Sequence, residues 1–210
     1  EDGRYTVALI EAGPKDTNPW IHIPVGYFRT MGNPRSDWCY KTESDQGIAG
    51  RAIPWPRGRV LGGSSSINGL LYVRGQAQDY DGWAQMGCTG WSWSDVLPLF
   101  QRSENWEGED DSGLRGKEGP LSVQNSRLTR DVVDKWVDAA VNAGYKRNPD
   151  YNGVDQEGVG YFQLTMKGVR RCSSDKAYLS NARDRKNLEI INDAQTEKVV
   201  VSEGRGVRVR

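Results

Sequence analysis

Residues 57–75 are the stretch of this chain whose residue types could do chemistry. They read RGRVLGGSSSINGLLYVRG, so two glycines and three serines interrupt an apolar run. Glycines let backbone amides approach a ligand closely, serines add hydroxyl donors, and a helix starting there would present its unpaired N–H groups. The pattern predicts a phosphate cradle. A serine-capped buried helix after a glycine turn is the alternative interpretation.

A second candidate is an acid at the end of a predicted strand. Residues 5–10, YTVALI, are short, apolar and rich in β-formers, which is typical of a strand buried on both faces of a parallel sheet. Glu11 follows directly. In dinucleotide-binding folds a carboxylate here accepts hydrogen bonds from ribose hydroxyls. A solvated strand end is the other interpretation, and we expect the glycine-rich phosphate loop of such a fold to lie upstream of Glu1.

The composition argues against several classes of protein. The 210 residues suffice for one large domain or two small ones, and the 28 basic and 28 acidic residues cancel, which disfavours nucleic acid as a partner. The apolar runs are far shorter than the roughly 20 residues of a transmembrane segment. Three widely separated cysteines without CxxC spacing argue against a disulfide framework and against a metal site: Cys39, Cys88 and Cys172. We expect a cytoplasmic protein, with peripheral membrane attachment left open.

Hydrophobic periodicity predicts the remaining elements. Residues 14–93 show little helical period and many Pro, Gly and Trp residues, which favours an irregular segment packed against a cofactor or another part of a protein. Ser92 and Asp95 have capping-box spacing and predict a short helix. The expected buried face of that helix is Val96, Leu97 and Phe100.

A longer helix and a group of strands are predicted farther along the chain. The apolar stripe expected on the helix comprises Val133, Trp136, Val137, Ala140 and Val141. Gly144 is its expected end. Residues 187–210 predict a strand, a turn, a strand, a turn and a third strand, with Gly204 and Gly206 in turns.

Taken together, GRVLGGSSSINGLLYVRGQAQDYD resembles the first signature of the glucose-methanol-choline (GMC) oxidoreductases, flavoproteins that oxidise alcohols. LIEAG resembles the family's second strand, DWCYKTE and IPWPRGR its lead-in to the flavin loop, and AYLSNARDRKNLEIINDAQTEKVV its return into the FAD domain. The likeness covers nearly the full chain and is greatest to choline dehydrogenase-like alcohol dehydrogenases.

The resemblance implies FAD as the cofactor and a role for each matching residue. Glu11 would hold the adenosine ribose, residues 62–64 would lie along the pyrophosphate, and Thr196 would hold the adenine through its backbone. Ile67 stands where some relatives carry the histidine that tethers the flavin, so noncovalent FAD is expected. The complete set of implied cofactor-binding residues is Glu11, Arg59, Gly62, Gly63, Ser64, Asn68, Gly69 and Thr196.

The fold implied by the resemblance is α/β, a partial FAD/NAD(P)-binding Rossmann-like domain with an inserted α+β substrate domain. We expect residues 1–105 to belong to the FAD-binding domain, with the flavin loop at 58–81. Residues 106–165 would form part of the substrate-domain insertion, and residues 166–210 would return to the FAD-binding domain.

The implied reaction oxidises a primary alcohol, choline-like or other, to the aldehyde by proton removal from the hydroxyl and hydride transfer to flavin N5. The family's catalytic histidine lies near the carboxyl end of full-length members, so no catalytic residue is assigned. His22, the chain's single histidine, is expected to be a structural or surface residue and not the catalytic one. We expect a fragment lacking both ends, inactive without the rest of its full-length chain, and its electron acceptor is not identified. A hydroxynitrile lyase-like FAD protein and a non-catalytic flavin- or partner-binding module remain alternatives.

Overall fold

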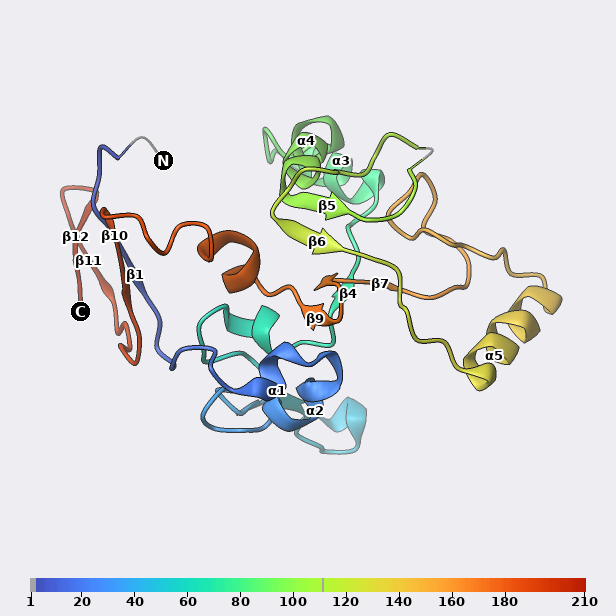
Figure 1. Ribbon diagram of the computed structural model, residues 1–210, viewed down its shortest axis with the longest axis horizontal. Helices are drawn as coiled ribbons and strands as arrows, with labels where there is room; N and C mark the ends of the chain where they lie inside the picture. Colours follow the sequence, from blue (N-terminus) through green and yellow to red (C-terminus); the bar gives the residue numbers. More distant parts are fainter. Residues whose placement is uncertain (1–2, 111) are drawn as a thin grey trace. The chain divides into compact units, whose positions relative to one another are not determined.

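The computed structural model describes residues 3–110 and 112–210, which group into two compact units (Figure 1). Unit 1 comprises the chain up to Gly69 together with Val169–Arg210, and unit 2 comprises Leu70–Gly168. These boundaries differ from the expected ones at 105/106 and 165/166. The assignment of cofactor and substrate roles to parts of the chain stays a prediction.

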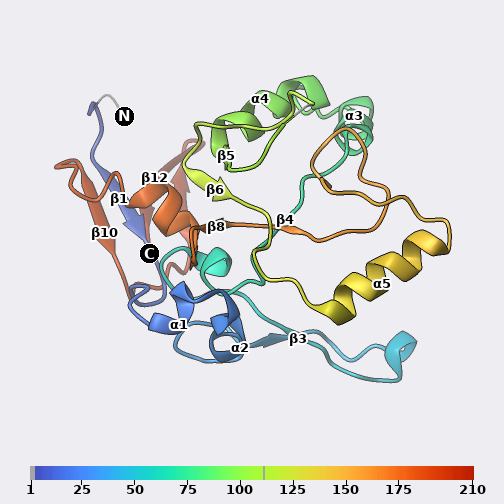
Figure 2. The same ribbon diagram turned by 45° about the vertical axis from the view of Figure 1, so that its right-hand side comes forward.

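Unit 1 contains a pair of parallel strands from opposite ends of the chain. Strand β1 (Val7–Ile10) pairs in register with β10 (Leu188–Ile191), and the two lie side by side in both ribbon views (Figures 1 and 2). The expected strand is present, but the expectation that it is buried on both faces was wrong. Val7 and Ile10 are exposed, and among the described residues β10 is the single strand that pairs with β1.

Short elements make up most of the rest of unit 1, as the scarcity of helical period predicted. Its small core contains Ile21, Val60 and Ile67. Its helices are α1 (Pro19–His22), η1 (Pro24–Gly26), α2 (Tyr27–Thr30), η2 (Gln46–Ile48), η3 (Gly63–Ser66) and η4 (Asp175–Leu179). Its short strands are β2 (Tyr40–Lys41), β3 (Pro54–Trp55) and β9 (Arg170–Arg171).

The end of the chain forms an antiparallel hairpin of β11 (Val199–Ser202) and β12 (Arg205–Val209). With β10 they confirm the three predicted strands. Gly204 lies in the turn with a φ of +74°, as expected. Gly206 does not lie in a turn: it belongs to β12 and pairs with Val201, where the register shifts at a bulge.

Unit 2 contains three longer helices and several short strands. The capping box is confirmed, because the backbone N–H of Ser92 donates to the carboxylate of Asp95 at 3.0 Å. An aromatic cluster lies where the first two of these helices, residues 77–85 and 93–103, meet. It consists of Tyr80, Trp83, Trp93 and Phe100. The helices are α3 (Ala77–Gln85), α4 (Trp93–Ser103) and α5 (Asp131–Asn142), and the strands are β4 (Leu71–Tyr72), β5 (Glu104–Trp106), β6 (Leu121–Val123), β7 (Gln163–Leu164) and β8 (Met166–Lys167).

Helix α5 ends as predicted but buries less than predicted. Gly144 has a φ of +100°, and the backbone N–H of Tyr145 returns to the carbonyl of Ala140 at 3.1 Å. Val137 is fully buried, whereas Trp136 of the same stripe is 64% exposed. The periodicity therefore identified the helix but overestimated the width of its packed face.

A buried ion cluster holds unit 2 together. The fully buried carboxylate of Glu104 accepts hydrogen bonds from the guanidinium groups of Arg74 and Arg115 and from the backbone N–H of Gly116. Arg115 also donates to Asp150 at 2.8 Å. Burial alone would lower the pKa of Arg115, but its hydrogen bonds and the charges of Glu104 and Asp150 raise it instead. Removal of one carboxylate would leave cations buried without their counter-ion.

We predict that Glu104→Gln destabilises unit 2 by about 3–5 kcal/mol, the usual cost of breaking a buried ion pair. The exposed Glu107→Gln, three residues away, is the matched control. Urea unfolding followed by tryptophan fluorescence measures both variants. Equal midpoints for Glu104→Gln and the unsubstituted protein would show that the cluster is not stabilising.

Candidate functional site

The glycine turn of the predicted cradle is a tight, left-handed bend. Gly62 and Gly63 have φ values of +89° and +56°, a region that side chains disfavour. A Cβ atom added to Gly62 would lie 2.5 Å from Oγ of Ser66, whereas one added to Gly63 would meet no atom within 4 Å. Gly62 is therefore required for packing within the loop, and Gly63 borders open space.

The segment after the glycines differs from the expected helix start. It is a single 3₁₀ turn, η3, rather than the first turn of an α-helix, so it aligns far fewer peptide dipoles than a longer helix would. Ser65 and Ser66 donate their hydroxyls to the carbonyls of Gly62 and Leu61, at 2.6 and 2.8 Å. These two serines thus fold the loop instead of offering their hydroxyls to a ligand. Ser64 is exposed, and its Oγ accepts the backbone N–H of Gly58 at 3.1 Å.

The structure brings three of the predicted residues to one cavity. Glu11, at the carboxyl end of β1, shares this cavity of about 520 Å³ with Gly62 and Gly63. The Glu11 carboxylate accepts the backbone N–H of Gly13 at 2.7 Å, which fixes its position at the strand end. The other lining residues are Leu9, Ile10, Leu61, Ser174, Asp175, Tyr178 and Leu179.

Four of those lining residues come from residues 174–179, where the sequence analysis named no cofactor-binding residue. Ser174 donates its backbone N–H to Oγ of Ser65 at 2.8 Å and its hydroxyl to the carbonyl of Gly62 at 3.1 Å. The π-helix η4 follows at once, and π-helical turns are frequent at functional sites. Residues more than 100 positions apart carry no local signal that they meet, so only the fold could identify Ser174.

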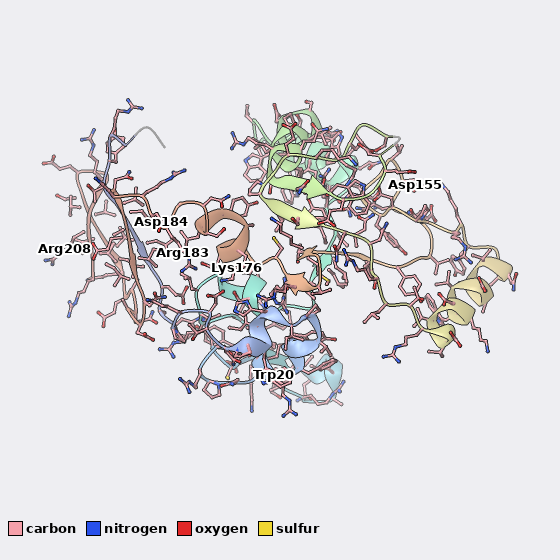
Figure 3. All side chains as sticks on the ribbon, in the orientation of Figure 1. Trp20, Asp155, Lys176, Arg183, Asp184 and Arg208 are labelled. Atoms are coloured by element: carbon pink, nitrogen blue, oxygen red, sulfur yellow. The ribbon has the colours of Figure 1, made fainter. Side chains whose placement is uncertain are left out.

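The first residue of η4 is a buried carboxylate between two cations. Asp175 lies 3.0 Å from Nζ of Lys176 and also pairs with Arg183, while Lys176 reaches Asp16 at 2.8 Å. The two cations, Lys176 and Arg183, are labelled in Figure 3. Burial favours the neutral acid, but the hydrogen bond from Lys176 and the charges of both cations outweigh it and lower the pKa of Asp175. The carboxylate therefore stays ionised at the cavity wall.

The remaining predicted residues lie outside the lining of this cavity. The guanidinium of Arg59 stacks 5.4 Å above the ring of Trp38. Asn68 and Gly69 follow η3, and Oδ1 of Asn68 accepts a hydrogen bond from Arg171 at 2.7 Å. Thr196 is exposed between β10 and β11.

His22 takes part in a local contact of the kind expected for a structural histidine. It is half-buried, and its Nε2 lies 2.8 Å from the carbonyl oxygen of Asp16. It is not among the residues that line the cavity. The described residues hold no group of three or more histidine, cysteine or acidic side chains arranged for a metal ion. Within residues 3–110 and 112–210, every helix is too short or too polar to reach across a lipid bilayer.

The geometry suits a ligand with a ribose and a phosphate. A carboxylate at a strand end accepts hydrogen bonds from vicinal hydroxyls, and side-chain-free backbone beside it admits a bulky anion without steric conflict. Glu11 and Gly63 meet these two requirements in one cavity. Because Gly13 holds the carboxylate in place and Gly63 leaves open space beside it, the arrangement is suited to binding.

Comparison with known proteins identifies a family and several relatives that match nearly the whole chain. Residues 15–210 match the family described as GMC oxidoreductase. The chain is 43% identical over 209 residues to an oxygen-dependent choline dehydrogenase of Brucella anthropi, and 39% identical over 208 residues to an alcohol dehydrogenase [acceptor] of Pseudomonas putida. These alignments cover 100% and 99% of this chain but only 38% of each relative.

A solved structure is similar over the same extent. The crystal structure of pyridoxine 4-oxidase from Mesorbium loti superposes with a TM-score of 0.91 at 32% identity, covering 99% of this chain and 41% of that protein. The chain thus spans about two fifths of the length of the proteins it matches.

We predict a pH dependence of stability from Asp175. Because its folded pKa lies below the ordinary 3.8, its ion pairs stabilise the protein above that pH and are lost as the pH falls through the folded value. Asp175→Asn should therefore be less stable than the unsubstituted protein at pH 6, with a difference that shrinks below pH 3.8. The exposed Asp184→Asn is the control, and thermal melts across pH measure both. A difference that is constant with pH would contradict the assignment.

Proposed function

Because this chain belongs to the family of GMC oxidoreductases, we propose that it forms the part of an FAD-dependent oxidoreductase that binds the adenosine and pyrophosphate of FAD. We further propose that the whole protein oxidises a primary alcohol to the aldehyde. The names of the two relatives, a choline dehydrogenase and an alcohol dehydrogenase, support this class of substrate. The chain matches 38% of their length, so the activity is proposed for the whole protein rather than for these residues alone.

One observation carries the proposal: Glu11 and the glycine turn line the same cavity although about 50 residues separate them in the chain. The cavity also passes a test of fit. Gly63 borders space that a side chain would fill, and the Glu11 carboxylate is held at the strand end by Gly13. Both features are those that a dinucleotide needs for close approach and ribose recognition.

The proposed contacts follow the arrangement of the loop. Glu11 would hold the adenosine ribose, residues 62–64 would lie along the pyrophosphate, and Asn68 with Gly69 would contact the flavin. Thr196 would reach the adenine through its backbone. Arg59, which stacks on Trp38, is the remaining residue proposed to bind the cofactor.

The FAD is proposed to be noncovalent. Ile67, the residue at the position of the tethering histidine in some relatives, has no nucleophilic atom. Its side chain is 1% exposed and packs with Ile21 and Val60 in the core of unit 1. A residue buried in this way is also unable to turn toward a ligand without opening the core.

Bound FAD would supply the acceptor of the hydride from the alcohol. The residues of this chain would bind and orient the cofactor: Glu11 by hydrogen bonds to the ribose, and the glycine turn by backbone contact. No catalytic base is assigned within the chain, since His22 is engaged with Asp16 and lies outside the lining of the cavity.

The experiment uses the protein encoded by the complete reading frame that contains these residues. We expect it to be purified with the visible absorption of oxidised flavin, and we expect choline or a simple primary alcohol to bleach that absorption under anaerobic conditions. A protein without flavin would overturn the proposed cofactor. A flavoprotein that no alcohol in a broad panel bleaches would overturn alcohol oxidation and favour a non-redox role.

We predict that Glu11→Gln lowers the affinity for FAD by about 10- to 100-fold, because hydrogen bonds to a charged acceptor contribute about 1.5–3 kcal/mol. Affinity for FMN, which has no adenosine, should be unchanged. Titration of the apoprotein, followed by quenching of flavin fluorescence, measures both. Glu43→Gln, an exposed acid of unit 1, is the control. Equal losses for FAD and FMN would rule out a ribose contact.

A further inference from the structure

Within residues 3–110 and 112–210, unit 1 contains a buried arginine whose guanidinium contacts no acidic side chain. Arg171, in β9, is 3% exposed. Its Nε donates to the carbonyl of Ile21 at 2.8 Å, and its Nη1 donates to the carbonyl of Ser65 at 3.1 Å and to Oδ1 of Asn68 at 2.7 Å. All three acceptors are neutral. Burial lowers the pKa of Arg171 to about 10, so it remains a cation at neutral pH.

Such a residue is costly for the folded state. A buried charge normally has a counter-ion, because desolvation costs several kcal/mol that neutral acceptors only partly offset. The second terminal nitrogen of Arg171, Nη2, is buried and makes no hydrogen bond within the described chain. The buried arginines of unit 2, Arg74 and Arg115, are both paired with Glu104. Arg171 therefore differs from them in a way that stability does not explain.

Arg171 makes its contacts with the glycine- and serine-rich loop of the candidate site. It reaches two residues of the segment from Gly62 to Asn68, which is the central part of the predicted flavin loop at 58–81 and alone carries that name below. Ser174, three positions later, binds the same loop at Gly62 and Ser65. The two residues thus hold the flavin loop at its beginning, middle and end. The loop's own secondary structure is one 3₁₀ turn, which is short and weakly held by itself.

Arg171 also sets the orientation of the Asn68 amide. A guanidinium has donors and no acceptor, so only the oxygen end of the amide can face it. The NH₂ group of Asn68 therefore points away from Arg171. In the proposed function Asn68 contacts the flavin, and the bond from Arg171 fixes the orientation of its amide.

We propose that Arg171 is a positioning residue for FAD, and that its charge, which no carboxylate in contact neutralises, favours the more negative reduced state of the cofactor. This inference rests on the proposed function. Its first part follows from the bonds to Ser65 and Asn68, and its second from the effect of fixed protein charge on the electronics of a bound cofactor. Ser174 is the second positioning residue, and it has no charge.

Two substitutions at Arg171 separate geometry from charge. Arg171→Lys keeps the cation but loses the planar fork that reaches three acceptors, whereas Arg171→Met keeps much of the side chain's length and loses the charge. Arg170→Met is the matched control, since Arg170 is the exposed neighbour in the same strand. All are made in the full-length holoprotein, with apoprotein melts to establish folding.

We expect Arg171→Lys to bind oxidised FAD about tenfold more weakly, with a midpoint potential close to that of the unsubstituted protein. Arg171→Met should lose a similar affinity for oxidised FAD and a further tenfold for reduced FAD. For a two-electron couple that extra factor is a midpoint potential lower by about 30 mV. Arg170→Met should change neither quantity. Fluorescence titration and anaerobic reduction against a reference dye measure them.

Several outcomes would overturn the inference. Unchanged FAD affinity in Arg171→Lys would refute positioning, and equal potentials for the Lys and Met variants would refute the effect of charge. If Arg171→Met fails to fold, Ser174→Ala with Arg171→Lys carries the positioning test, and both must weaken FAD binding. In that case the effect of charge is tested with Arg171→Gln, and the midpoint potential of its bound FAD must be lower than that of Arg171→Lys. A parent protein that binds no FAD refutes the proposed function instead, so the two failures are distinguishable.

Discussion

The candidate site depends on the hydrogen bonds that hold the flavin loop from a distant part of the chain. The loop is glycine- and serine-rich, and its one regular element is the 3₁₀ turn η3. Glycine loses more conformational freedom on ordering than other residues, so such a loop needs partners outside itself. Arg171 and Ser174 are those partners, and both bind its backbone carbonyls. Although more than 100 residues separate the loop from Arg171 and Ser174, their hydrogen bonds can hold it in one conformation.

Glu11 lies at the end of β1, whose partner strand β10 comes from the other end of the chain. Parallel strands cannot be joined by a tight turn, so β1 and β10 must be connected by a crossover, which here includes all of unit 2. The chain that returns from the crossover passes through β9 and η4 before it pairs with β1. This returning segment therefore brings Ser174 against the loop. The loop and the end of β1 line the same cavity.

The buried charged side chains differ in whether a group of opposite charge lies beside them. In unit 2 the carboxylates of Glu104 and Asp150 compensate Arg115, and the cluster is a structural support. Asp175 in unit 1 is likewise compensated, by Lys176 and Arg183. In the described part of the chain, the acceptors of Arg171 are all neutral. Because an uncompensated buried charge is unfavourable by several kcal/mol, Arg171 does not stabilise unit 1 in the way that the ion cluster stabilises unit 2.

The sequence by itself determined the elements with strong local signals: the capping box at Ser92, the end of α5 at Gly144, the strand before Glu11, and the glycine turn at 62–63. It also carried the family signature, because that signature is a continuous stretch. Only the tertiary structure decided that η3 is a single 3₁₀ turn, that β1 is exposed, and that Arg171 and Ser174 hold the flavin loop. These features depend on which distant segments meet, and periodicity and spacing report only on neighbours along the chain.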